Sequence, residues 1–70
     1  MAERLLNHLR DLRAERDLTQ AALAEAVGVS RKTINTVENG VFVPSTTLAL
    51  KLAAALGCRV EQVFFLSSQE

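Results

Sequence analysis

The stretch VGVSRKTINTVENG, residues 27–40, is the most informative part of the sequence about the fold. Gly28 follows the end of one helical pattern, where a left-handed backbone conformation is least costly, and Ser30 stands where it can cap the next helix. That next helix should run from Arg31 to about Asn39, with Gly40 as its C-terminal stop. The stretch therefore predicts two short helices joined by a three-residue turn.

The second of these helices has a polar face and an apolar face. At about 100° per residue, Ile34 and Val37 point to the interior. The opposite side carries Lys32, Asn35, Thr36 and Asn39. From Ser30 to Val37 there are two positive charges and no negative one, although the whole chain has eight of each sign. Any affinity for a polyanion must therefore come from the distribution of charge and not from an overall basic chain.

The flanking patterns are helical as well. Leucines spaced by three and four (Leu5, Leu9, Leu12) form a stripe before the pair, and a second leucine stripe (Leu48, Leu52, Leu56) follows it. Thr19 and Ser45 are good N-caps, because their hydroxyls can accept an otherwise unpaired amide hydrogen bond. The expected helices cover about residues 2–16, 20–27, 31–39, 46–56 and 60–64, within a core of about 5–66 and ahead of a flexible tail at 67–70.

Length and composition favour one all-α domain over residues 1–70. The chain has 70 residues, of which 49% are hydrophobic but only three are aromatic, so aliphatic side chains must supply most of the core. One cysteine, Cys58, permits no internal disulfide, and no stretch is apolar enough to span a membrane. A cytoplasmic protein fits these properties best. With one histidine, His8, and one cysteine, neither a metal site nor a catalytic set can be assembled, so no enzyme is expected.

A tight pair of short helices packed by other helices is a helix-turn-helix motif, which leaves the outer face of its second helix available to a partner. Such a helix fits the major groove of duplex DNA. There arginine and lysine can donate to guanine, and asparagine can pair with adenine. The residues that suit base reading are Arg31, Lys32, Asn35 and Thr36. The simpler interpretation is that this polar face is only solvated.

The chain resembles a known family through three segments. LTQAALAEAVGVSRKTINTVENG (residues 18–40), PSTTLALKLAAALG (44–57) and VEQVFFL (60–66) look like the Xre family, the phage repressor and Cro type of helix-turn-helix regulator. The resemblance covers roughly residues 5–66. It implies a compact five-helix, lambda-repressor-like domain that binds double-stranded DNA, without a cofactor, and regulates transcription, most often as a repressor.

The resemblance also implies roles for single residues. Arg13 and Glu38 match a structural ion pair that ties the first helix to the end of the third. Many relatives carry a basic residue just after the Asn-Gly, where this chain has Val41, Phe42 and Val43, so the phosphate contribution should be weaker here. The residues that match contacts to the DNA backbone are Gln20, Ser30, Thr33 and Asn39.

One short recognition helix reads only a few base pairs, so specificity is expected from a homodimer on a palindromic site. The candidates for the dimer interface are Leu50, Phe65 and Leu66, although Phe65 could instead fold back over the C-terminal end. Two alternatives stay open. The chain could be an antitoxin-like or adaptor protein that acts mainly on a protein partner, or the DNA-binding portion of a longer, effector-responsive regulator.

Overall fold

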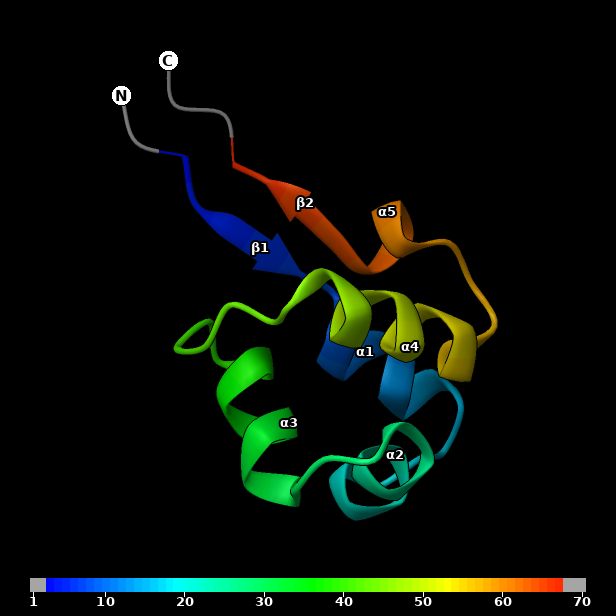
Figure 1. Cartoon of the computed structure of the whole chain (residues 1–70). Coiled ribbons are helices and arrows are strands. Elements are labelled where there is room, and N and C mark those ends of the chain that lie inside the picture. Colours follow the sequence, from blue (N-terminus) through cyan, green and yellow to red (C-terminus); the bar gives the residue numbers. More distant parts are fainter. Residues whose placement is uncertain (1–2, 68–70) are drawn as a thin grey trace.

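The computed structural model describes residues 3–67 and is mostly helical, with one small antiparallel ribbon (Figure 1). The expected all-α, five-helix fold is confirmed, and two short strands are added to it. In chain order the elements are β1 (Leu5–Asn7), α1 (Leu9–Glu15), α2 (Gln20–Val27), α3 (Arg31–Glu38), α4 (Thr46–Leu56), α5 (Val60–Val63) and β2 (Phe64–Leu66).

The helix ends follow the capping signals in the sequence. The hydroxyls of Thr19, Ser30 and Ser45 each accept the backbone N–H of the residue three positions on, at 2.9–3.1 Å. Gly28 and Gly57 end α2 and α4 in the left-handed conformation, with φ of 77° and 70°. The predicted bounds of α2 and α4 are therefore confirmed, and α3 ends one residue earlier than expected, at Glu38.

Aliphatic side chains supply almost the whole core. Leu9 from α1, Ile34 from α3 and Leu52 from α4 have no exposed surface. Each such side chain contributes on the order of 1.5–3 kcal/mol through burial. The other buried core residues are Leu23, Ala24, Val27, Val37, Leu48, Ala53, Leu56, Val63 and Phe64. This core fixes α3 through its inner face only and leaves its outer face to solvent.

The prediction of a first helix over residues 2–16 is wrong at its N-terminal end. Residues 5–7 form β1, which pairs with β2 in the register Leu5–Leu66, Leu6–Phe65 and Asn7–Phe64. The leucine spacing is compatible with a helix, but pairing with a segment about 60 residues away satisfies the same backbone groups. Asn7 is the last residue of β1, and its Oδ1 accepts the N–H of Leu9, the first residue of α1, at 3.0 Å.

The last helix is also shorter than predicted, because Phe64 belongs to β2 and not to α5. Ser67, expected in a flexible tail, is hydrogen-bonded to Arg4 through both its backbone N–H and its Oγ, at 2.8 and 3.1 Å. Residues 68–70 of that expected tail lie outside the described residues. The ribbon extends away from the helices, with its two strands side by side (Figure 1).

Within residues 3–67, no helix combines the length and the apolar character that crossing a membrane requires.

Candidate nucleic-acid interface

The outer face of α3 is open to solvent. Ser30 caps the helix, and Ile34 and Val37 anchor it in the core. Of the four predicted base-reading residues, Arg31, Lys32 and Asn35 are exposed. These three side chains and Gln20 line a shallow hollow between α2 and α3. The structure thus brings most of the predicted readers together on one accessible surface.

Thr36 is placed less favourably for base reading. Its side chain is half-buried, and its hydroxyl donates to the carbonyl of Thr33 at 2.9 Å. The hydroxyl proton is therefore used within the helix, and only the oxygen can still accept a bond from a ligand. Thr33 is half-buried too, and its hydroxyl lies 3.0 Å from that of Ser30 at the start of the helix.

Gln20 joins α2 to α3. Its Nε2 donates to Asn35 Oδ1 at 3.2 Å and to Glu38 Oε1 at 3.0 Å, which uses both of its N–H groups. The backbone N–H of Gln20, at the first position of α2, lies where a helix has no internal acceptor and where its dipole favours an anion. The backbone amide of Gln20 is therefore better placed to meet a phosphate than its side chain.

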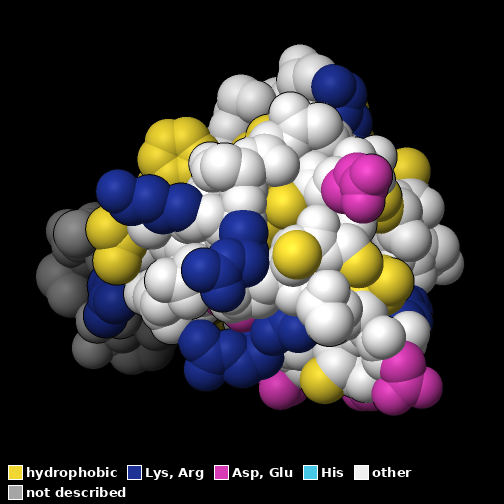
Figure 2. All heavy atoms as spheres, turned by 90° about the horizontal axis from the view of Figure 1, so that it is seen from below, with side chains coloured by type: hydrophobic (Ala, Val, Ile, Leu, Met, Phe, Trp, Pro, Cys, Tyr) yellow, Lys and Arg dark blue, Asp and Glu magenta, His cyan; other side chains and the backbone are white. Residues whose placement is uncertain are grey.

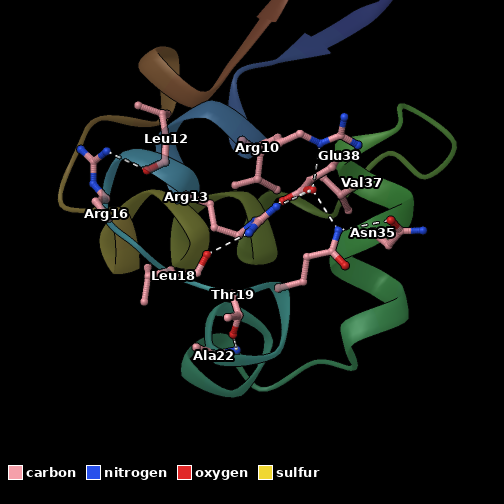
Figure 3. Close-up of polar contacts among 12 residues, drawn as sticks. Arg10, Leu12, Arg13, Arg16, Leu18, Thr19, Ala22, Asn35, Val37 and Glu38 are labelled. Atoms are coloured by element: carbon pink, nitrogen blue, oxygen red, sulfur yellow. Dashed lines mark hydrogen bonds and ion pairs between the residues drawn. The ribbon is translucent and has the colours of Figure 1, made fainter.

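Glu38 is the centre of a polar cluster between α1, α2 and α3 (Figure 3). Its side chain has no exposed surface. Arg13 Nε donates to Glu38 Oε2 at 2.6 Å, and Arg13 Nη1 donates to the carbonyl of Leu18 at 2.8 Å. Burial by itself would raise the pKa of Glu38, but the hydrogen bond from Arg13, that from Gln20, the charge of Arg13 and the bond from Arg10 together lower it. Glu38 is thus an inward-facing, neutralised carboxylate.

Arg10 was not singled out from the sequence, yet it reaches the same cluster. Its Nε donates to Glu38 Oε1 at 3.5 Å, and its Nη2 donates to Asn39 Oδ1 at 2.8 Å. The amide of Asn39 in turn donates to Asn35 Oδ1 at 3.3 Å. The signal that could have identified Arg10 is its spacing: it precedes Arg13 by three residues, so the two lie one helical turn apart on α1.

The charges are unevenly spread over this side of the molecule. Figure 2 views it from below relative to Figure 1. Most of the visible Lys and Arg side chains lie in its left and central parts, on the α3 side, with others at the top and the right edge, and Asp and Glu side chains lie toward the right and along the lower edge. The chain is neutral overall, but this face offers a locally cationic surface next to α3.

The candidates for the dimer interface lie elsewhere. Leu50 on α4 is 53% exposed, and Leu66 on β2 is 58% exposed. Phe65 is 36% exposed and stacks on His8, with 4.6 Å between the ring centroids. The ring of Phe65 is therefore partly covered by its own chain, whereas the two leucines are free to meet another molecule.

No group of three or more potential ligands among His, Cys, Asp and Glu comes together within residues 3–67. Cys58 packs half-buried against the core. Arg59 makes no side-chain cap for α5; instead Gln62 Oε1 accepts the Arg59 N–H at 2.8 Å. The polar chemistry of the described residues is concentrated around α3.

Comparison with known proteins gives concordant matches. Residues 9–63 match the helix-turn-helix family. The HTH-type transcriptional regulator YgzD of Bacillus subtilis is 41% identical over 63 residues, which cover 90% of this chain and 96% of that protein. The restriction-modification controller protein C.AhdI of Aeromonas hydrophila superposes with a TM-score of 0.74 at 37% identity, over 77% of this chain and 82% of that one. The P22 c2 repressor in complex with a synthetic operator gives a TM-score of 0.73 at 34% identity, over 76% of this chain and 80% of that one.

Proposed function

Since the chain belongs to the helix-turn-helix family of DNA-binding transcriptional regulators, which are not enzymes, we propose that it is a repressor that reads a palindromic operator as a homodimer. Helix α3 enters the major groove and its N-terminal half faces the base edges. Repression follows when the bound dimer covers a promoter. The protein acts in the cytoplasm.

The observation that carries this proposal is the outer face of α3. Arg31 and Lys32 offer cationic donors in its first turn, and Asn35 lies one turn further along. Asn35 Oδ1 accepts bonds from Gln20 and Asn39, so pairing with adenine replaces at least one of these bonds. Contacts with the DNA backbone fix the register of the helix on the duplex. The residues that make them are Gln20, Ser30, Thr33 and Asn39.

Burial of Glu38 supports the same proposal. Its carboxylate is turned away from the outer face of α3 and is neutralised by Arg13. A free carboxylate at this position would repel phosphate groups. The arrangement leaves α3 without an acidic side chain directed at the DNA.

The test is selection of bound duplexes from a random pool, followed by sequencing. We expect a two-fold symmetric consensus whose half-sites are centred one helical turn, about 34–36 Å, apart. Enrichment of an asymmetric motif would contradict the homodimer, and the absence of any enriched motif would contradict sequence-specific binding.

A second function, as an adaptor that binds a protein partner, is favoured by one observation. Val41, Phe42 and Val43 follow α3 and are 77%, 47% and 67% exposed. Exposed apolar side chains in succession are uncommon unless they meet another molecule. Purification of the protein from its native host with and without nuclease treatment separates the two functions, because a protein partner remains bound after the DNA is digested.

A further inference from the structure

We propose that Arg10, on α1, is a further ligand for a DNA phosphate and acts together with Asn39 at the end of α3. This proposal rests on the proposed function, because it concerns the same bound duplex. It adds a contact from outside the helix-turn-helix motif, and the ligand is one phosphodiester group of the DNA backbone.

The first argument is the charge of the cluster. Glu38 carries one negative charge, which is balanced by the positive charge of Arg13. Arg13 Nε is 2.6 Å from Glu38 Oε2, and the Arg13 side chain is only 16% exposed. Arg10 makes a longer contact of 3.5 Å with the same carboxylate, and its side chain is 59% exposed. Two arginines share one carboxylate, so the cluster keeps a net positive charge, and that charge lies on the accessible arginine.

No other acidic side chain neutralises Arg10. Within the described part of the chain, Glu38 is the only one that forms an ion pair with Arg10 within 4 Å. Asp11 lines the same surface hollow as Arg10, together with Asn7, His8 and Glu38, but makes no such pair with it. An anion from outside can therefore approach Arg10 without displacing a strong internal partner.

The second argument is the set of available donors. A guanidinium has five N–H groups. One goes to Glu38 and one to Asn39, which leaves three without a protein partner among residues 3–67. Arg10 occupies Asn39 Oδ1, so the amide nitrogen of Asn39 is turned toward Asn35 and the outer face of α3. The free N–H groups of the Arg10 guanidinium suit the acceptor oxygens of a phosphodiester.

The third argument is position. The guanidinium of Arg10 lies over the C-terminal end of α3, next to Glu38, and Asn35 lies one helical turn closer to the start of α3 (Figure 3). The segment after α3, Val41–Val43, brings no cation to this place. Arg10 and Arg13 both reach the C-terminal end of α3 from α1, and Arg10 is the more exposed of the two.

The experiment measures DNA affinity by fluorescence anisotropy at several salt concentrations, with a random-sequence duplex and with the selected operator. Arg10→Gln should weaken binding to both duplexes by a similar factor. It should also reduce the slope of log K against log salt by about 0.9 for each bound subunit, because each phosphate that the protein neutralises contributes about that much to the slope. Arg10→Lys keeps the charge and should retain most of the slope.

The matched control is Arg59→Gln, which removes the same charge from a side chain that is 80% exposed and pairs only weakly, at 4.0 Å, with Glu61. It should leave the salt slope unchanged. An unchanged slope for Arg10→Gln, or a loss of affinity that merely follows a lowered melting temperature, overturns the role of Arg10 while the proposed function stands. Failure of the unaltered protein to bind either duplex overturns both.

Discussion

Glu38 lies on the helix proposed to enter the DNA groove, but its side chain has no exposed surface. Hydrogen bonds from Arg13, Gln20 and Arg10 reach its two carboxylate oxygens from α1 and α2. A buried charge is tolerated only when such partners replace its water. This one residue therefore couples the placement of α3 to the other two helices, and its ionisation should control stability.

The pH dependence of folding follows from Glu38. Its pKa in the folded protein is below the ordinary value of 4.5. A carboxyl whose folded pKa is lowered stabilises the protein above its unfolded pKa, and this contribution is lost as the pH falls through the folded pKa. We expect the free energy of unfolding, measured with urea, to fall below about pH 4.5 as Glu38 becomes protonated.

Glu38→Gln should reduce the free energy of unfolding at pH 7 by roughly 1–3 kcal/mol, because the half-buried guanidinium of Arg13 loses its counter-charge. It should also flatten the decline toward acid pH. Glu25→Gln is the matched control, since Glu25 is exposed on α2. A variant at Glu38 that declines with pH as steeply as the unaltered protein would show that other carboxyl groups are responsible.

The division between base readers and backbone contacts is also tested at single residues. Arg31→Ala and Lys32→Ala should each relax sequence preference at one position per half-site, at a cost of about 1–3 kcal/mol. Gln20→Ala should weaken all sequences to a similar degree, because the side chain supports the placement of α2 against α3. Affinities for the operator and for single-base variants of it measure the difference. Equal losses on every sequence from all three substitutions would contradict the assignment.

At the scale of elements, two serine caps offer a controlled comparison. Ser30 and Ser45 each accept the N–H of the residue three positions on, at 3.1 Å, at the starts of α3 and α4. Ser30→Ala and Ser45→Ala should each lower stability by about 1 kcal/mol through loss of the cap. Only Ser30→Ala should weaken DNA binding at temperatures where both variants are fully folded, because only Ser30 is proposed to face the DNA backbone.

Thermal unfolding and anisotropy on the same samples give both quantities. If Ser45→Ala weakened binding as much as Ser30→Ala, the effect would come from general destabilisation of the fold. If neither variant had a reduced affinity, Ser30 would be a helix cap only.

The sequence predicts the helices well where the signals are local. The helix bounds depend on residues next to each helix in the sequence. A residue with a hydroxyl group precedes each of α2, α3 and α4, and a glycine follows α2 and α4. The ribbon carries no comparable signal. Its pairing joins Leu5 to Leu66, and each strand alone is three residues long, too short for an alternating pattern to be read. Pairing over such a separation depends on the packed helices that bring the two ends together.

In the candidate interface, too, local features could be predicted from the sequence and contacts between elements could not. Helical periodicity is enough to place Arg31, Lys32 and Asn35 on one open face. It does not reveal that the Thr36 hydroxyl bonds back to the helix, or that Arg10 reaches Asn39 from another element. Contacts between elements depend on how helices cross, which no local spacing specifies.

At the scale of the whole molecule, the ribbon and the α3 face are separate surfaces. The described part is elongated, with principal extents of 37 × 21 × 20 Å, and the ribbon projects from the helices (Figure 1). An exposed strand edge and an exposed leucine are features through which a second copy can pair. The ribbon, through Leu66, is therefore a better candidate for the homodimer interface than α4, through Leu50.

Substitution of the two exposed leucines decides between these surfaces. Leu66→Lys should weaken the homodimer at least about tenfold, or roughly 1.4 kcal/mol, because a lysine would be placed in an apolar contact. Leu50→Lys, which makes the same change at a similarly exposed position on α4, should leave the dimer intact. Sedimentation at micromolar concentration measures both, and anisotropy on a single half-site shows whether the Leu66→Lys monomer keeps its recognition helix in order. The reverse result would move the interface to α4, and an unaltered protein that sediments as a monomer with and without operator would remove the homodimer from the proposal.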